Sequence, residues 1–453
     1  MARFVKWSVV LLACVGLLLS QWPRARSLYE LTGEDDLDGQ LIGVMQWVNT
    51  AVRPQPRLAA TTEFNIQPET IFGVNTFLQQ EVEPEKRERS MQLLREAGFH
   101  YIRQEFTWED IEIHAKGDFE DRRNVEAVGV VDAWAKYDQI VALAEQYDVE
   151  VIARLSNPPS WSRSQPDEVI GSNAPPDDVA DYADFVRAVA MRYNGRLSYF
   201  QLWNEPNIYP EWGEQNVDPE AFTALLCAGY HAIKAVNPDM VVLLGALSPT
   251  VAMDGRNVND LVFLQRMYNA GAGDCFDVAS AQGYGLWSGA LDQRLKPNVI
   301  NYPHNLYLRD VMVRHGDADK PIWISELGWN VVPEGMDDRF GRVTPEQQAR
   351  FAVEAYERAQ SEWPWVGVVN YWFLKRKDES ELDQSFYYFR LLDADFAPQP
   401  VYDALAETLP QAAEPELQAA WIYDWMGIRP YLFIPSLAIL FFSLFRWLTP
   451  HED

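Results

Sequence analysis

Short runs of apolar, β-branched and aromatic residues recur along the chain, and longer amphipathic segments separate them. Apolar runs of about four to eight residues are typical of buried strands. Eight strands are expected, at 70–77, 101–108, 149–156, 199–205, 241–248, 276–285, 321–329 and 366–374. Their starts lie roughly 30 to 50 residues apart, which leaves room for a crossover helix between successive parallel strands.

The intervening segments carry apolar residues at helical spacing. Helices are expected at 84–97, 131–147, 178–193 and 344–362. Thr344 is a candidate N-cap, and Pro345 would take the first helical position. Strands that alternate with helices in this way predict an α/β fold, a (β/α)8 TIM barrel over residues 69–410. The alternative is an open doubly wound sheet, but such a sheet would need a glycine-rich phosphate turn, and the sequence has none.

The amino-terminal end of the chain is apolar and uncharged from residue 7 to residue 22, after Arg3 and Lys6. This pattern predicts a signal peptide or an uncleaved signal anchor over residues 1–22. We favour the anchor, because small residues are not placed for cleavage after the apolar run.

A second uncharged run, residues 430–445, lies between Arg429 and Arg446. It predicts a transmembrane helix at 426–448, and the alternative is an amphipathic or core helix. Two linkers are expected. Residues 23–68 would form a juxtamembrane linker with one short helix near 41–52, and residues 411–425 would form a second linker after the barrel.

The charge balance excludes one class of partner. The 453 residues include 66 acidic and 38 basic side chains, for a net charge of −28. A chain with this negative charge repels the phosphate backbone of nucleic acids. We therefore expect no nucleic-acid partner. The 17 Trp, 20 Tyr and 22 Phe suit a carbohydrate ligand, because flat rings stack on sugar C–H faces, although core packing accounts for most of them.

Motifs for cofactors and metals are missing from the sequence. It contains no P-loop, no G-x-G-x-x-G, no G-x-S-x-G and no C-x-x-C pair. We therefore expect no cofactor and no metal. Cys227 and Cys275 are the only two cysteines in the predicted barrel, and the sequence leaves open whether they are bonded.

Candidate chemistry appears at the carboxyl ends of the predicted strands, where working residues of such barrels lie. Read in order, these ends supply Asn75, Arg103, Asn157, Asn204, Glu205, Tyr284, Glu326 and Trp372. Two carboxylates thus converge from the fourth and seventh strands. Retaining cleavage of a glycosidic bond needs such a pair, one acid to protonate the leaving oxygen and one carboxylate about 5–5.5 Å away to attack the anomeric carbon.

The motifs around the two glutamates resemble those of glycoside hydrolase clan A, the retaining (β/α)8 glycosidases. WNEPN (203–207) is similar to the acid/base motif of the clan, and WISELGW (323–329) resembles its nucleophile motif. YIRQEFTWEDIE (101–112) is similar to the second-strand arginine segment of the family 39 and family 5 branches. Residues 182–207 and 391–405 also resemble the family 39 type. The resemblance covers about residues 69–410.

This resemblance implies catalytic roles for three residues. Glu205 would be the general acid/base, with a pKa raised by its surroundings. Glu326 would be the nucleophile, and Arg103 would keep it ionised by charge pairing.

The resemblance also implies substrate-binding roles. Asn204 would hydrogen-bond the sugar 2-hydroxyl, Tyr284 would donate to the nucleophile, and Trp372 would form the floor of the subsite. One position departs from the clan, since Gln282 stands where many members carry histidine. Four further tryptophans are candidates either for sugar subsites or for core packing: Trp108, Trp161, Trp287 and Trp329.

The sequence thus predicts a membrane-tethered retaining glycosidase that hydrolyses O-glycosyl bonds of a poly- or oligosaccharide. We expect it at the cell membrane, with the barrel on the extracytoplasmic side. The alternative is a non-catalytic saccharide-binding or scaffold protein on a decayed barrel, but decay should first remove a carboxylate. A transglycosylase would share the first half-reaction. The sequence does not identify the sugar, the linkage or a protein partner.

Overall fold

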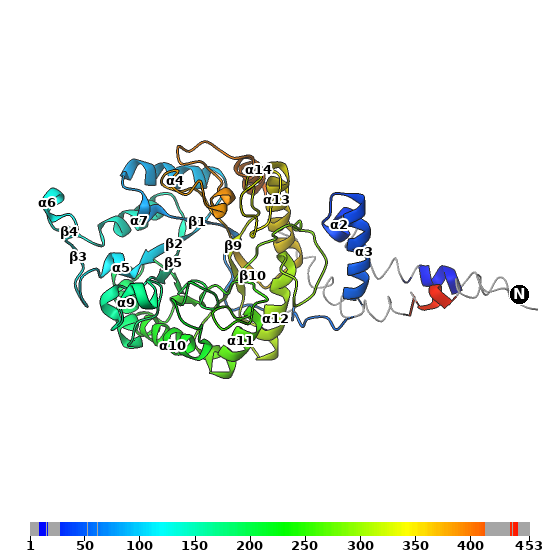
Figure 1. Cartoon of the computed structure of the whole chain (residues 1–453), viewed down its shortest axis with the longest axis horizontal. Helices are drawn as coiled ribbons and strands as arrows, with labels where there is room; N and C mark the ends of the chain where they lie inside the picture. The colour runs from blue at the N-terminus through cyan, green and yellow to red at the C-terminus, as the bar shows by residue number, and fades with distance from the viewer. Residues whose placement is uncertain are drawn as a thin grey trace, which may run out of the picture.

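Eight parallel strands form the centre of the molecule, and helices surround them (Figure 1). The computed structural model describes residues 9–14, 16, 28–51, 53–60, 62–412, 435–436 and 438–442. The strands are β1 (Phe72–Thr76), β2 (Tyr101–Thr107), β5 (Glu150–Ser156), β6 (Tyr199–Leu202), β7 (Val241–Leu243), β8 (Ala279–Gln282), β9 (Ile322–Leu327) and β10 (Val366–Tyr371). Each lies within one of the eight predicted segments, so the predicted barrel is confirmed.

The sheet runs in the order β7-β6-β5-β2-β1-β10-β9-β8, and β7 and β8 meet at a seam that closes the ring. Two isolated bridges join the seam, Leu243 with Val278 and Leu247 with Ala281. A disulfide bond between Cys227 and Cys275 ties α10 (Pro219–Val236) to the segment that leads into β8.

The outer helices follow the strands in the predicted alternation. They are α4 (Pro84–Glu96), α7 (Ala135–Gln146), α9 (Val179–Arg192), α10, α11 (Asp260–Asn269), α12 (Asn305–Arg314), α13 (Pro345–Glu362) and α14 (Pro400–Thr408). Thr344 caps α13 in a reciprocal box with Gln347, and Pro345 begins the helix, as predicted.

Shorter helices lie in the connections between these elements. They are α5 (Trp108–Ile111), α6 (Val125–Val128), α8 (Asp167–Ile170), η1 (Leu78–Gln80), η2 (Ser160–Ser162), η3 (Ala272–Asp274), η4 (Tyr302–His304), η5 (Ser385–Phe389) and η6 (Leu409–Gln411). The predicted helix 131–147 begins later than expected. Its first two residues instead form β4 (Val131–Asp132), which pairs antiparallel with β3 (Glu120–Asp121) in an arm that projects from the barrel (Figure 1).

Side chains inside the barrel are layered, because alternate residues of a strand point to the same face. The layer nearest the strand starts is apolar and includes Tyr101, Tyr199, Val278 and Trp323. The residues two positions later form a polar layer: Arg103, Gln201, Ser280 and Ser325. Along these four strands the interior therefore changes from apolar to polar between one inward-facing residue and the next.

A β-bulge in β9 interrupts this alternation. Ala281 of β8 pairs with Ile324, but the next residue, Gln282, pairs with Glu326. On the other side, Val369 pairs with Ile324 and Tyr371 with Leu327, so β9 holds one extra residue against both neighbours. The bulge turns two consecutive side chains, Ser325 and Glu326, toward the barrel interior.

The predicted amino-terminal linker contains two helices, α2 (Leu28–Thr32) and α3 (Leu37–Ala51). The helix α3 is longer than the short helix expected near 41–52. Residues of this region contact the barrel, where Tyr29 donates to Glu354 of α13 at 2.8 Å and Asp35 pairs with Arg350 at 2.7 Å.

The two predicted membrane segments, 1–22 and 426–448, and the linker 411–425 lie largely outside the described residues. Within the part of the chain that is described, no helix has both the length and the apolar character needed to cross a membrane.

Candidate active site

Trp203, whose backbone is in the left-handed region, connects the end of β6 to the Asn204–Glu205 motif. The strand ends at Leu202, and Trp203 adopts a φ of 76°, which is unfavourable for a residue with a large side chain. Its indole is buried at 1% exposure, packs against Tyr182 and Trp212, and donates to the backbone oxygen of Glu211 at 2.9 Å. This packing holds the strained turn, after which Asn204 and Glu205 follow directly.

Three donors converge on the carboxylate of Glu326, which is 4% exposed. Arg103 Nη1 donates to Oε1 at 2.8 Å, Tyr284 Oη to Oε2 at 2.7 Å, and Gln282 Nε2 to Oε2 at 3.0 Å. Burial, followed by the charge of Glu326, raises the pKa of Tyr284 well above its ordinary value, so this phenol keeps its proton and donates it. The three donors match an acceptor-only carboxylate.

Gln282 joins the two glutamates. Its Nε2 atom donates to Glu205 Oε1 at 2.6 Å and to Glu326 Oε2 at 3.0 Å. Because one nitrogen contacts both oxygens, these oxygens lie within about 6 Å of each other, near the separation of about 5–5.5 Å typical of retaining sites. The residue that departs from the clan pattern therefore supports the site rather than weakening it.

Glu205 has the electrostatic surroundings of an acid. Burial raises its pKa from 4.5 to about 8, and the charges of Glu326 and Glu211 add to the rise. Hydrogen bonds from Ser248 and Gln282 act in the opposite direction. A carboxyl group with this pKa holds its proton at neutral pH.

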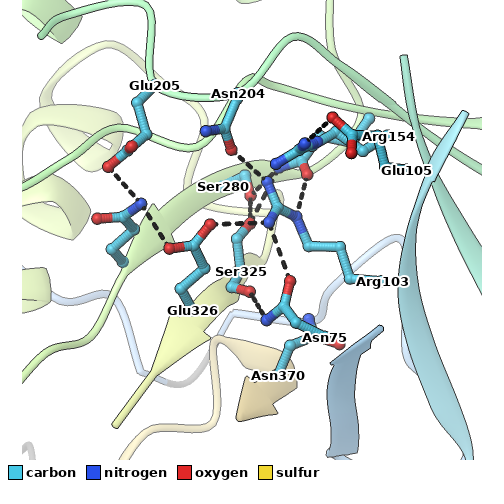
Figure 2. A network of polar contacts seen from close by, with 12 residues as sticks. Asn75, Arg103, Glu105, Arg154, Asn204, Glu205, Ser280, Ser325, Glu326 and Asn370 are labelled. Carbon is cyan, nitrogen blue, oxygen red and sulfur yellow. Dashed lines mark hydrogen bonds and ion pairs between the residues drawn. The ribbon is translucent and has the colours of Figure 1, made fainter. Parts of the chain in front are cut away.

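Arg103 is the hub of the polar layer, at 3% exposure. Besides Glu326, its guanidinium donates to Asn75 Oδ1 at 3.0 Å, Asn204 Oδ1 at 2.7 Å and Gln201 Oε1 at 2.5 Å (Figure 2). A buried arginine needs such a set of acceptors to offset its lost hydration. The structure thus brings six of the residues predicted at the strand ends together in one network: Asn75, Arg103, Asn204, Glu205, Tyr284 and Glu326.

Several supporting residues were missed by the sequence analysis. Gln201 Nε2 donates to Ser280 Oγ at 2.7 Å and to Ser325 Oγ at 2.9 Å, which fixes the amide that accepts from Arg103. Gln201 and Ser280 stand two positions before Trp203 and Gln282, and Ser325 directly precedes Glu326. The available signal was their polarity at inward-facing positions of strands that are otherwise apolar.

Aromatic candidates divide between the site and the core. Trp372 directly follows β10, is partly exposed, and packs edge-on against Phe77 at 5.4 Å. Trp108 and Trp329 are fully buried in the hydrophobic core, so they are not subsite residues. Of the other two, Trp161 packs against Trp108, and Trp287 is 57% exposed.

A polar cleft of about 710 Å³ opens beside the network, at the carboxyl ends of β2 and β5. Its lining includes Glu105, Glu109, Asn157 and Ser160. Glu105, on the cleft wall, forms an ion pair with Arg154 (Figure 2). Among the described residues, no group of three or more His, Cys, Asp or Glu side chains is arranged to hold a metal ion.

Solved structures of similar fold come from several glycoside hydrolases. A family 39 glycoside hydrolase from Bacteroides cellulosilyticus WH2 is 20% identical, with a TM-score of 0.52 over 76% of this chain and 65% of that chain. A monomeric β-xylosidase from Caulobacter crescentus CB15 is 17% identical, with a TM-score of 0.52 over 80% of this chain and 70% of that chain. The chain thus spans about two thirds of the length of these two proteins.

GH5_18 from Streptomyces cattleya, solved as E153A in complex with Manb1-4GlcNAc, is 16% identical, with a TM-score of 0.55 over 77% of this chain and 83% of that chain. At these identities the likeness concerns the fold. No curated protein sequence matches the chain.

The sequence model of the cellulase family, glycosyl hydrolase family 5, matches residues 60–315. This range is more than half of the chain and includes Arg103, Asn204, Glu205 and Tyr284, although Glu326 lies beyond it. The chain belongs to the cellulase family, glycosyl hydrolase family 5, which confirms the resemblance to clan A.

Proposed function

We propose that this protein is a retaining glycosidase that cleaves O-glycosidic bonds of a poly- or oligosaccharide by double displacement. The observation that carries the proposal is the Gln282 amide, which contacts both Glu205 and Glu326 and so keeps their carboxyl oxygens within about 6 Å. An inverting site would need carboxyl groups about 6.5–9.5 Å apart, to admit a water molecule between acid and sugar.

In the first step a Glu326 carboxylate oxygen attacks the anomeric carbon of the bound sugar. The bond from that carbon to the leaving oxygen breaks, and Glu205 transfers its proton to that oxygen. The pKa of about 8 at Glu205 suits this step, because the carboxyl group is protonated at neutral pH. The leaving group departs as an alcohol, and the sugar is held as an ester of Glu326.

In the second step Glu205, now ionised, removes a proton from water, and the water oxygen attacks the anomeric carbon. The ester bond to Glu326 breaks, and both glutamates return to their first protonation states. Arg103 and Tyr284 donate to Glu326 and so favour its return as a carboxylate. The polar cleft supplies donors and acceptors for further sugar hydroxyls.

The proposal also places the protein in a membrane, with the barrel outside the cell. Near the two ends of the chain, Leu11, Leu12, Phe441 and Phe442 are exposed, whereas Ala13 and Ser436 are buried. Gly16 lies so close to Ser436 that a side chain on it would clash, so the two end segments are neighbours. Large apolar side chains outward and small ones between helices are typical of packing in lipid.

The orientation rests on two arguments of different kinds. Polysaccharides occur outside the cell, and the Cys227–Cys275 disulfide is of the kind that persists in oxidising compartments. The positive-inside signal is weak, since Arg3 and Lys6 are balanced by Arg24 and Arg26.

A trapping experiment tests the enzyme. The full chain in detergent is incubated with activated 2-deoxy-2-fluoro β-glycosides of glucose, xylose and mannose, digested, and analysed by mass spectrometry. We expect a glycosyl adduct on the peptide that holds Glu326 and none in Glu326→Gln. An adduct on another residue, or a first product of inverted configuration by NMR, would overturn the retaining mechanism. Sugar binding without turnover of any glycoside would favour the decayed-barrel alternative.

Orientation is tested by labelling in whole cells. A cysteine at Met191, which is 64% exposed on the barrel, should react with a membrane-impermeant maleimide in intact cells. The parent chain, with Cys14 only as free thiol, is the control. Labelling of the new cysteine only after lysis would reverse the orientation.

A further inference from the structure

The helix α3 presents an apolar face that the described residues of the chain leave uncovered. We propose that this face lies on the surface of the membrane, in contact with lipid, and that α3 thereby holds the barrel with its cleft turned away from the bilayer. This inference rests on the proposed function, because attachment to a membrane is part of that proposal.

The exposed apolar residues of α3 gather on one side of the helix. Leu37, Leu41 and Met45 follow one another at intervals of four residues, so they form a row along the helix, and Ile42 lies beside that row. These four side chains are between 50% and 67% exposed. Of the 15 residues of α3, only Asp38 is charged. Such a patch of large apolar side chains on a helix with one charge indicates a surface that contacts a partner.

The opposite side of α3 packs on the rest of the molecule. Gly43 lies so close to Thr32 of α2 that a side chain on it would clash. Farther along the helix, Gln46 accepts from Arg294 of the barrel at 3.3 Å. The exposed row therefore lies on the side of α3 that faces away from its own chain.

The hairpin of α2 and α3, residues 28–51, is firmly joined to the barrel. Arg350 and Glu354 belong to α13, which follows β9, and Arg294 lies between β8 and α12. Three polar contacts reach them: Tyr29 with Glu354 at 2.8 Å, Glu34 with Arg294 at 2.9 Å and Asp35 with Arg350 at 2.7 Å. Because of these contacts, α3 cannot settle on a surface without fixing the orientation of the whole barrel.

The position of α3 favours lipid as its partner. The predicted anchor ends at residue 22 and α2 begins at Leu28, so the connection spans about 20 Å at full extension. Along the longest axis of the molecule, α2 and α3 lie between the barrel and the described pieces of the two end segments (Figure 1). With 15 residues α3 is about 22 Å long, too short to cross about 30 Å of hydrocarbon, so it would lie along the surface.

The apolar face, and not charge, would hold α3 on the lipid. The helix contains no lysine or arginine, so it has no cation to attract anionic headgroups. The contact therefore depends on the apolar area that enters the headgroup region. A modest area suffices, because a segment tethered to the bilayer meets lipid at a high effective concentration.

The place of the hairpin on the barrel determines where the cleft points. The hairpin contacts the barrel beside β8 and β9, whereas the cleft opens at β2 and β5. In the closed sheet order these two pairs of strands lie across the ring from each other. With α3 on the membrane, the cleft faces away from it. This orientation suits a saccharide outside the bilayer rather than a sugar carried on a lipid headgroup.

Depth-dependent fluorescence quenching tests the lipid contact. The full chain carries Cys14→Ala, which removes its free thiol, and a fluorophore on a cysteine at Met45, and it is reconstituted in phosphatidylcholine vesicles. We expect nitroxide lipids labelled near the headgroup to quench this fluorophore several-fold more than lipids labelled at the bilayer centre. The same fluorophore at Met191, which is exposed on α9, should be quenched by neither.

Acidic substitutions in the apolar row provide a second test. Leu37→Glu together with Leu41→Glu should lower the quenching at Met45 several-fold, whereas Val128→Glu, at an exposed position of the arm, should leave it unchanged. Since all three positions are exposed, melting temperature and hydrolysis of a small aryl glycoside should not change in either variant. Quenching at Met45 that the two glutamates do not lower would overturn the inference.

Energy transfer to an acceptor lipid tests the orientation. A donor at Met45 should transfer strongly, and a donor on a cysteine at Val128, on the cleft side of the barrel, should transfer weakly. Equal transfer from the two positions would show that the cleft does not face away from the bilayer.

Flotation of the vesicles separates this inference from the proposed function. A chain that floats with the vesicles but keeps a bright label at Met45 is attached to the membrane, and the inference fails, as it would if a second copy covered the face. A chain that does not float overturns both the attachment and the inference. If the label is quenched as expected and no glycoside is hydrolysed, the lipid contact stands and the proposed enzyme activity fails.

Discussion

The two ends of the barrel interior are built by the same strands but from opposite kinds of side chain. Near the strand starts, three rings pack with centroid distances of 4.9 to 6.0 Å: Tyr101, Tyr199 and Trp323. Two residues farther along the same strands the side chains are polar and hydrogen-bonded: Arg103, Gln201 and Ser325. The apolar layer lies at one end, and the two glutamates lie beyond the polar layer at the other.

The apolar layer therefore contributes mainly to the stability of the fold, and the residues at the polar end contribute mainly to the reaction. Apolar side chains stabilise a fold roughly in proportion to the area they bury. Buried charges such as Arg103 and Glu326 need complete sets of partners merely to offset their lost hydration. We therefore expect substitutions in the apolar layer to change the free energy of unfolding, and substitutions among the site residues to change the reaction.

The largest effect is expected at Glu326. In Glu326→Ala no covalent intermediate can form, so kcat should fall on the order of 10⁵-fold for substrates with good and poor leaving groups alike. The measurement is steady-state hydrolysis of aryl glycosides with leaving groups of graded acidity. The melting temperature of Glu326→Ala should not show a loss comparable to the loss of kcat. A large loss of stability with the loss of rate would break the separation of the two layers.

Glu205→Ala should discriminate between leaving groups. Poor leaving groups need a proton, so their hydrolysis should lose about 10²–10⁴-fold, the usual contribution of general acid catalysis. A dinitrophenyl glycoside needs no proton and should still form the glycosyl-enzyme, which a burst of released phenol would reveal. An equal loss for every leaving group would remove Glu205 from the acid role.

Trp323→Ala tests the apolar layer. This indole is fully buried, and the variant should lower the free energy of unfolding by about 3–5 kcal/mol, measured by denaturant titration. The control Trp287→Ala removes a 57% exposed indole and should change stability by at most about 0.5 kcal/mol. If Trp323→Ala kept its stability but lost activity as completely as Glu326→Ala, the two layers would not be distinct.

The smallest effect concerns how ionisation of Glu205 changes the stability of the folded chain. The pKa of Glu205 is about 8 in the folded chain, against an ordinary value of 4.5, so the unfolded chain ionises first as pH rises. Glu205 therefore lowers stability progressively between these two values and fully above about 8. Glu205→Gln should raise the melting temperature by about 1–2 °C at pH 8.5 for each kcal/mol relieved, and should have little effect at pH 4. A shift of equal size at both pH values would contradict the raised pKa.

The strands and helix ends were predictable because the spacing of apolar residues and the capping residues indicate them directly. All eight strands and the Thr344 cap follow from local pattern. The strand-end rule also located Glu205 and Glu326, since parallel strands bring their carboxyl ends to one face. Features encoded in the pattern of a single strand are therefore predictable from the sequence.

Features that depend on neighbouring strands were not predictable. Simple alternation would send the side chains of Ser325 and Glu326 to opposite faces, and only the register of β8 and β10 reveals the bulge that turns both inward. The sequence shows only that Gln282 replaces a histidine common in the clan, whereas its contact with both carboxylates depends on the ends of two other strands. Burial of Trp108 likewise depends on Phe185, which lies far along the chain and stacks on it at 5.2 Å.

The seam between β7 and β8 has a consequence for how the barrel opens. Five backbone hydrogen bonds cross it, among them Leu244 N to Val278 O at 3.0 Å and Gln282 N to Leu247 O at 3.2 Å. The Cys227–Cys275 bond closes a loop of 48 residues across this side and so limits local unfolding there. After reduction we expect faster amide hydrogen exchange at Leu244 and Gln282 than elsewhere in the strands. Since Gln282 holds the two glutamates, the redox state of the compartment would set how long the site stays assembled.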